Sequence, residues 1–241
     1  MQYRALPAHQ APTRRLASWR PTTMREWPGH IATSLRLWGC SFRCPECSAT
    51  ALREQVDESV DWTEVVAYVD AHRAMLDGVV VTGGEPTEDP DLPSLLAALK
   101  DLDVAVRLDT NGARPDVLAL LLAEALVDEV ALDVKTVPAR YRALCEERDM
   151  AARVAECADM LIASRIDHEF RTTLVPGLVD IGELPRIART LHGGRLYALQ
   201  QYRRVSETGP APLPDESLGL AAEECRRFLP TIVRGLDIGE D

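Results

Sequence analysis

The stretch GCSFRCPEC, residues 39–47, holds three cysteines and guides the interpretation of the whole chain. Cys40, Cys44 and Cys47 have the spacing C-x3-C-x2-C, which lets one loop bring three thiolates to a compact centre. Thiolates favour zinc, copper(I) and iron–sulfur clusters. A closed structural zinc site normally takes a fourth Cys or His from nearby, and no histidine stands near the triplet. The triplet therefore predicts a metal centre with one open position; structural zinc and buried, non-ligating cysteines are the alternatives.

The composition excludes several classes of protein. The chain has 241 residues, of which 46% are hydrophobic, enough for a substantial core. A net charge of -11 disfavours binding to nucleic acid. No apolar run reaches the roughly 18 to 20 residues that a membrane span needs. The other cysteines, Cys145, Cys157 and Cys225, stand singly, so we expect neither a disulfide framework nor a second cluster.

Around the triplet, short apolar runs alternate with amphipathic stretches. Strands are predicted at 31–38, 78–82, 104–109, 129–134, 169–175 and 195–200. Helices are predicted at 61–76, 92–102, 115–126, 148–165 and 180–192. The alternation predicts an α/β fold with parallel strands. Periodicity alone leaves open whether the sheet is doubly wound or forms an incomplete β/α barrel.

Polar or glycine-rich residues follow the predicted strands. They are GGEP after the second strand, DTNG after the third, and LDVK and FRTTLVPG within the fourth and fifth. The carboxyl ends of parallel strands share one face, where active sites are assembled from separate loops. We therefore expect these residues to lie near the cysteine loop.

The N-terminal region has a different character. Residues 1–25 carry five arginines, no acidic residue and no apolar period. We predict a flexible basic arm over 1–25 and a single domain over 26–241. The twin arginine pair at 14–15 lacks the apolar stretch of an export signal, so a cytoplasmic location is expected.

The cysteine triplet followed by GGE resembles the radical S-adenosylmethionine (SAM) superfamily, and within it the glycyl-radical-enzyme activating proteins. The resemblance covers roughly residues 26–202. Its segments are EWPGHIATSLRLWGCSFRCPEC, VTGGEPTEDPDL, RLDTNG, VALDVK, EFRTTLVPG and YALQQYR. The anaerobic ribonucleotide-reductase activating type is the most similar, and pyruvate formate-lyase activase is also similar. The resemblance implies an incomplete (β/α)6 TIM-like barrel of parallel strands, the radical SAM core.

The resemblance also implies the cofactors and a role for each site residue. The three cysteines would hold a [4Fe–4S] cluster whose fourth iron binds SAM, and an electron from the cluster would split SAM into methionine and a 5′-deoxyadenosyl radical. Backbone groups of Gly83 and Gly84, with Glu85, would hold the SAM amino group. Asp109, Thr110 and Asp133 would help hold a monovalent cation beside the SAM carboxylate. Arg171 would contact SAM itself.

Each assignment has a simpler alternative. The glycines and Glu85 could form only a tight connection after the strand. Asp109, Thr110 and Asp133 could contact SAM directly or be purely structural. Arg171 could form a buried salt bridge. Lys135, one of the chain's two lysines, is the candidate catalytic residue that reaches the substrate; pairing with an acid or a solvated surface position are the alternatives.

Two departures from the resembled family bear on function. Glu46 stands before Cys47, where the family usually has an aromatic residue near the SAM adenine, and Gln200-Gln201-Tyr202 replaces the Pro-aromatic-His pattern of the pyruvate formate-lyase activases. The expected function is an oxidoreductase that installs a glycyl radical on a partner enzyme, with electrons from a flavodoxin- or ferredoxin-like donor. Radical modification of a small molecule or peptide, and a non-catalytic metal-stabilised binding protein, are the alternatives.

Overall fold

A computed structural model describes residues 16–47, 50–53, 60–204, 207 and 209–236. The chain divides into two compact units. The first unit contains residues 1–41 and 49–130, and the second contains residues 42–48 and 131–241. The cysteine loop therefore contributes to both units, with Cys40 in the first and the other two cysteines of the triplet in the second. The expectation of one domain over 26–241 stays a prediction.

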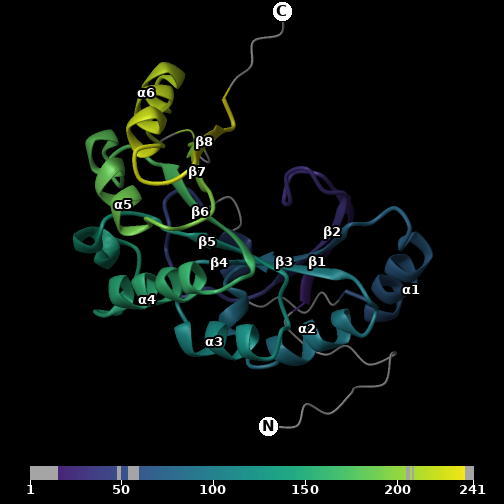
Figure 1. The fold of residues 1–241 in the computed structure, drawn as a ribbon. Helices are drawn as coiled ribbons and strands as arrows, with labels where there is room; N and C mark the ends of the chain where they lie inside the picture. Colours follow the sequence, from purple (N-terminus) through teal and green to yellow (C-terminus); the bar gives the residue numbers. More distant parts are fainter. Residues whose placement is uncertain (1–15, 48–49, 54–59, 205–206, 208, 237–241) are drawn as a thin grey trace, which may run out of the picture. The chain divides into compact units, whose positions relative to one another are not determined.

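The first unit contains four complete strands. Its elements are β1 (Leu16–Thr23), β2 (Ala32–Leu37), η1 (Thr50–Arg53), α1 (Trp62–His72), β3 (Gly78–Gly83), η2 (Pro86–Glu88), α2 (Leu92–Lys100), β4 (Ala105–Thr110) and α3 (Pro115–Ala123). Strands β2, β3 and β4 are parallel, and Val80 pairs with Ser34 on one side and Arg107 on the other. Figure 1 shows α1, α2 and α3 along one face of these strands.

Local sequence explains these elements. The run GVVVTG of β3 is β-branched and buried over its first four residues, as a strand covered on both faces requires. Helix α1 begins after Asp61, whose side chain accepts a hydrogen bond from the Thr63 N–H at 2.8 Å. Helices α2 and α3 carry proline in their first turn, where a missing N–H costs little.

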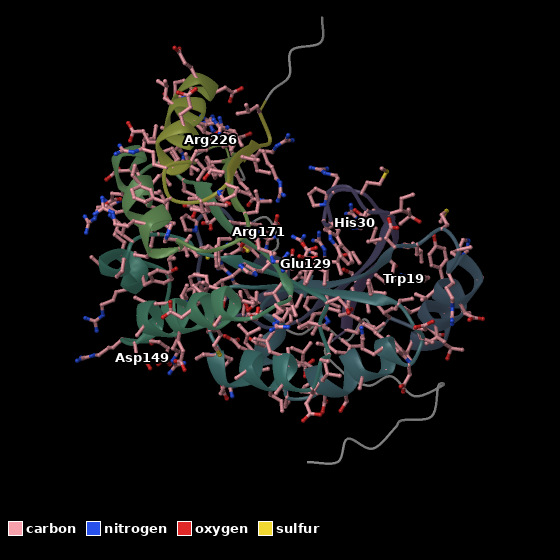
Figure 2. The ribbon with its side chains drawn as sticks, viewed as in Figure 1. Trp19, His30, Glu129, Asp149, Arg171 and Arg226 are labelled. Carbon is pink, nitrogen blue, oxygen red and sulfur yellow. The ribbon has the colours of Figure 1, made fainter. Side chains whose placement is uncertain are left out.

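The expectation of a flexible N-terminal arm over 1–25 is wrong for residues 16–23, because these residues form β1. This strand pairs antiparallel with β2, and Trp19 lies opposite Leu35. The indole Nε1 of Trp19 (Figure 2) donates to Thr33 Oγ1 at 2.8 Å. The strand owes its existence to pairing with the next strand along the chain, which no period within residues 16–23 reveals. Residues 1–15 of the predicted arm lie outside the described residues.

The second unit repeats the alternation of strand and helix. Its elements are η3 (Pro138–Ala143), α4 (Met150–Ala163), β6 (Asp167–Leu174), η4 (Ile181–Glu183), α5 (Leu184–Thr190), β7 (Tyr197–Gln201), α6 (Asp215–Cys225) and β8 (Thr231–Arg234). Strands β6, β7 and β8 are parallel, and Tyr197 pairs with Phe170 on one side and Thr231 on the other. Strand β5 (Glu129–Asp133) gives its first two residues to the first unit and its last three to the second.

All six predicted strands and all five predicted helices are present in the structure. The predicted α/β class with parallel strands is therefore confirmed. The structure adds β1, α6 and β8, which the sequence pattern did not predict. Within the described residues, no helix is both long and apolar enough to cross a membrane.

Candidate functional site

In the second unit, Cys44 and Cys47 are the two ends of a tight turn. The Cys47 N–H donates to the Cys44 carbonyl at 3.2 Å, with Pro45 and Glu46 between them. Proline at the second position fixes the backbone angle that such a turn needs. The loop is anchored at the end of η3, because the Arg43 N–H donates at 2.7 Å to the carbonyl of Leu144, the residue that follows this helix. The turn thus holds two of the three candidate thiols at its ends.

Phe42 gives the same loop an apolar anchor. Its ring lies 6.4 Å from that of Tyr141 in an edge-on arrangement, and Tyr141 is buried in η3. The hydroxyl of Tyr141 in turn accepts a hydrogen bond from the Lys135 N–H at 3.2 Å. Burial raises the pKa of Tyr141, so it stays a neutral phenol at physiological pH. One aromatic side chain therefore ties the cysteine loop to the segment after β5.

In the first unit, Cys40 follows β2 and Gly39. The Gly39 N–H donates to the Leu52 carbonyl at 2.7 Å, which joins the start of the cysteine loop to η1. The Asn111 side-chain amide approaches the Cys40 sulfur at 3.7 Å. A donor aimed at sulfur favours the thiolate form that metal ligation requires.

The donor set fits a thiolate-bound cluster. Within the described residues none of the six cysteines forms a disulfide; those of the triplet are only partly buried, whereas Cys145, Cys157 and Cys225 are buried. Burial raises the pKa of the Cys145 and Cys225 thiols, which makes both poor ligands. Across the described residues, no three Cys, His, Asp or Glu side chains are gathered as a metal site. Ligation by the triplet therefore rests on spacing, exposure and the turn.

The glycines of the GGE motif are required by the backbone itself. The Gly84 N–H donates to the Leu37 carbonyl at 2.9 Å, and the next N–H, of Glu85, donates to the Gly39 carbonyl at 2.7 Å. A Cβ atom at Gly84 would overlap the Gly39 carbonyl oxygen. Gly83 has a φ of +128°, which side chains rarely adopt. The simpler alternative, a tight connection after the strand, thus describes what these glycines do here.

Glu85 is buried and held by four hydrogen bonds from its own unit. Oε1 accepts from the Thr110 hydroxyl at 2.6 Å, the Thr87 hydroxyl at 2.5 Å and the Thr87 N–H at 3.0 Å. Oε2 accepts from the Asn111 N–H at 2.6 Å. Burial raises the pKa of Glu85 to about 7 although these bonds lower it. The carboxyl group therefore braces the end of β4 against the turn after β3.

Asp109 and Thr110 end β4 within polar contacts of the first unit. Asp109 Oδ1 accepts from Arg107 Nε at 3.0 Å. Arg107 is buried and also pairs with Glu129 Oε1 at 2.5 Å. The Trp27 indole donates to the other oxygen of Glu129 (Figure 2) at 2.8 Å. Asp109 therefore already has a cationic partner supplied by its own strand.

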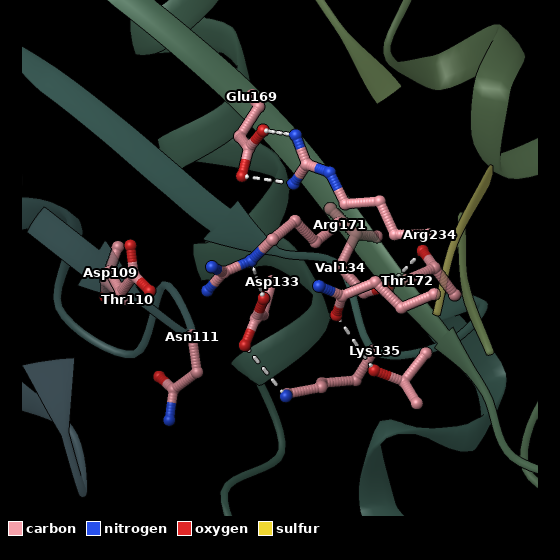
Figure 3. A network of polar contacts seen from close by, with 12 residues as sticks. Asp109, Thr110, Asn111, Asp133, Val134, Lys135, Glu169, Arg171, Thr172 and Arg234 are labelled. Atoms are coloured by element: carbon pink, nitrogen blue, oxygen red, sulfur yellow. Dashed lines mark hydrogen bonds and ion pairs between the residues drawn. The ribbon is translucent and has the colours of Figure 1, made fainter. Parts of the chain in front are cut away.

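Three charged residues form a compact network in the second unit (Figure 3). Asp133 Oδ1 accepts from Arg171 Nε at 2.7 Å, and Asp133 Oδ2 accepts from Lys135 Nζ at 2.9 Å. Burial opposes ionisation of Asp133, but the two cations outweigh it and lower its pKa to about 2. Burial likewise opposes the charge of Lys135, yet the neighbouring carboxylates Asp133 and Glu46 raise its pKa.

This network decides between the alternatives for its members. Lys135 is 15% exposed and ion-paired, so the solvated surface position is wrong. Arg171 forms the partly buried salt bridge that was its alternative. Both oxygens of Asp133 are engaged by cations of the chain, as the purely structural alternative describes, and direct contact with SAM stays a prediction. The cation itself stays a prediction.

Glu46 belongs to the same network, which sequence reasoning did not foresee. Its Oε1 lies 3.5 Å from Lys135 Nζ, and its side chain is only 9% exposed. Its Oε2 has no hydrogen-bond partner within the described part of the chain. Arg107 and Glu129 were missed as well. An arginine inside a buried strand was a signal that could have revealed them, because a buried charge needs a partner.

The chain is similar in sequence to known proteins. The profile described as "Radical SAM superfamily" matches residues 38–191. Two proteins of Methanocaldococcus jannaschii, each named "Putative glycyl-radical enzyme activating enzyme" (MJ1227 and MJ1632), are both 29% identical. The alignments cover 80% and 86% of this chain and 83% and 84% of those proteins. A PqqA peptide cyclase of Methylorubrum populi is 29% identical over 59% of this chain and 40% of that protein.

The fold is also similar to that of a solved radical SAM protein. A radical SAM methyltransferase from Sphaerobacter thermophilus superposes with a TM-score of 0.67, covering 88% of this chain and 69% of that chain at 18% identity. This likeness confirms the predicted fold class, the α/β radical SAM core. Since the family profile spans more than half of its length, the chain belongs to the radical SAM superfamily, with a [4Fe–4S] cluster and SAM as its cofactors.

Proposed function

We propose that this radical SAM enzyme installs a glycyl radical on a partner enzyme. The observation that carries the proposal is its similarity to two proteins named as glycyl-radical enzyme activating enzymes, over most of both chains. When bound, the cluster supplies an electron that cleaves SAM into methionine and a radical able to abstract hydrogen from a glycine Cα. A flavodoxin- or ferredoxin-like protein is the proposed electron donor.

The cysteines have the first role in this proposal. Cys40, Cys44 and Cys47 hold the cluster, and the turn closed by the Cys47 N–H presents two of these thiols from one short segment. Asn111 donates toward the Cys40 sulfur and stabilises it as a thiolate. The cluster's open position follows from having three protein ligands.

The charged network of the second unit binds the amino-acid end of SAM in this proposal. Asp133 fixes the side chains of Arg171 and Lys135, which otherwise have many rotamers. Lys135 and Arg171 are the cations that attract the SAM carboxylate, while Asp133 acts as their positioning residue.

In the first unit, Gly83, Gly84 and Glu85 have a supporting role. Their backbone hydrogen bonds to Leu37 and Gly39 fix the start of the cysteine loop. The Glu85 carboxyl fixes Thr110 and Asn111. Backbone groups of this segment remain the proposed contacts to the SAM amino group.

A second candidate function is radical modification of a peptide. The similarity to a PqqA peptide cyclase favours it, although that match covers only 40% of the cyclase. The two functions share SAM cleavage and differ in the substrate from which hydrogen is taken. The experiment therefore needs one readout for cleavage and another for the substrate.

The first test is anaerobic reconstitution with iron and sulfide, followed by dithionite and SAM. Formation of 5′-deoxyadenosine is expected for the wild type and for Cys145→Ala, and should be lost in Cys44→Ala. The second test adds a glycyl-radical enzyme from the same organism and looks for the glycyl radical by electron paramagnetic resonance. Cleavage of SAM with no radical on the partner, but with conversion of a peptide, would decide for the second candidate.

A further inference from the structure

A cavity of about 370 Å³ lies between α4 and α5 of the second unit (Figure 1). Val154 of α4 and Ile187 and Leu191 of α5 line it, together with Val134 and Val137 from the segment after β5. An engineered apolar cavity of about 150 Å³ is large enough to bind benzene. The cavity therefore has room for an aromatic or large aliphatic group.

Polar side chains of the same cavity fall into two groups. The Thr136 and Thr190 hydroxyls donate to backbone carbonyls at 2.7 and 2.8 Å, and the Tyr141 hydroxyl accepts from a backbone N–H at 3.2 Å. Asp159 and Arg186 are exposed, and neither has a hydrogen-bond or ion-pair partner within the part of the chain that the structure describes. The cavity thus combines an apolar lining with two charges that the chain does not use.

These two charges are opposite in sign but do not pair with each other. No ion pair joins Asp159 of α4 to Arg186 of α5, so more than 4.0 Å separates their charged atoms. A ligand with an ammonium and a carboxylate would engage both residues at once. Its carboxylate would accept from the Arg186 guanidinium, and its ammonium would donate to the Asp159 carboxylate.

We infer that the cavity binds a free amino acid with a large apolar side chain. The side chain lies between α4 and α5, and the amino and carboxylate groups bind Asp159 and Arg186. Ligand pockets in proteins have this composition, an apolar lining with a few polar groups that fix the orientation of the ligand.

This site is distinct from the charged network of the same unit. Its lining includes none of Asp133, Lys135 and Arg171. It does include Val134 and Thr136, which flank Lys135 in the sequence. A bound amino acid therefore contacts the segment that carries Lys135 without occupying the network itself.

The test measures binding by calorimetry to the full-length, cluster-loaded protein under anaerobic conditions. SAM is present and reductant is absent, so that an added amino acid does not compete for the open position of the cluster. The ligands are L-phenylalanine, L-leucine and L-alanine. Phenethylamine lacks the carboxylate of phenylalanine, and 3-phenylpropionate lacks its ammonium.

Four variants separate the apolar and the charged parts of the site. Ala155→Phe fills the cavity from a lining position that is exposed, and Ala152→Phe is the matched control, exposed on the same helix but not part of the lining. Arg186→Gln and Asp159→Asn each remove one charge. Both residues are exposed, so these two variants keep the inference testable even if Ala155→Phe does not fold.

We expect phenylalanine and leucine to bind and alanine not to bind. Ala155→Phe should lose this binding, whereas Ala152→Phe should keep it. Arg186→Gln should weaken phenylalanine and 3-phenylpropionate about fivefold, which is about 1 kcal/mol, and leave phenethylamine unchanged. Asp159→Asn should weaken phenylalanine and phenethylamine to a similar extent and leave 3-phenylpropionate unchanged.

Four outcomes overturn the inference. They are no binding of phenylalanine or leucine, binding of alanine as tight as that of phenylalanine, unchanged binding in folded Ala155→Phe, and equal affinity for phenylalanine, phenethylamine and 3-phenylpropionate. The last would show a cavity that accepts any apolar molecule. Cleavage of SAM and the glycyl radical are measured separately, so the proposed function stands or falls independently of this site.

Discussion

Glu85 should make the first unit less stable as the pH rises. Its carboxyl group is 1% exposed, and burial raises its pKa to about 7 from an ordinary value of 4.5. A group with a raised folded-state pKa contributes stability that is fully present below pH 4.5 and is lost as the pH rises through about 7. The shift corresponds to about 3 kcal/mol, most of it lost between pH 5 and 8.

The comparison with Glu85→Gln isolates this contribution. Glutamine cannot titrate. Its amide NH2 would also face at least one of the groups that donate hydrogen bonds to Glu85, which belong to Thr87, Thr110 and Asn111. The variant should therefore be less stable than the wild type by about 1 to 3 kcal/mol at pH 5. By pH 8 this difference should shrink by about 2 to 3 kcal/mol, because only the wild type loses stability through this group.

Tryptophan fluorescence is the appropriate assay. The four tryptophans, at positions 19, 27, 38 and 62, all belong to the first unit, which also contains Glu85. Urea unfolding of the reduced apoprotein at pH 5, 6, 7 and 8 gives the free energy of unfolding for each variant. Glu64→Gln, an exposed carboxylate in the first turn of α1, is the control and should differ from wild type by a constant amount.

Other titrating groups do not mimic this effect. The pKa of Asp133 is about 2, so Asp133 remains ionised from pH 5 to 8 and contributes no slope there. Burial lowers the pKa of His168, so that histidine favours stability at higher pH, in the direction opposite to Glu85. A stability difference between wild type and Glu85→Gln that stays constant from pH 5 to 8 would refute the reasoning.

Three further predictions concern the glycines, the charged network and the cysteines. Gly84→Ala should lower the free energy of unfolding in urea by about 3 kcal/mol or more, because the added Cβ has no space. Gly182→Ala is the control and should unfold like the wild type, because its Cβ would meet open space. Asp133→Asn should weaken SAM binding about tenfold in calorimetry at unchanged iron content, since it removes the charge that pairs with Lys135 and Arg171 without touching a cysteine; unaltered affinity contradicts it. Cys44→Ala should lose cluster iron in a colorimetric assay, whereas Cys145→Ala should keep about four irons per chain; equal loss would show that the buried cysteine was misread.

The sequence revealed elements whose pattern is local. The buried run of β3 and the spacing of apolar residues in α1 are each contained in a dozen residues, so their class could be predicted. Strand β1 could not, because Pro21 and exposed residues obscure any alternation and its stability comes from pairing with β2. Helix α6 was not predicted either, because it contains Gly219, and glycine is a poor helix former.

The site was predictable as a list of residues rather than as a set of contacts. Asp133 and Arg171 were both identified, but their salt bridge depends on the registers of separate strands. Glu85 was assigned to a ligand, whereas in the structure its oxygens serve Thr87, Thr110 and Asn111. Sequence spacing shows that a polar group is available, and only the fold shows whether the chain itself already uses it.

This distinction decides where mutagenesis can report on cofactor binding. Variants at Gly84 or Glu85 disturb backbone and side-chain contacts within the first unit, so a loss of activity there would not separate folding from SAM recognition.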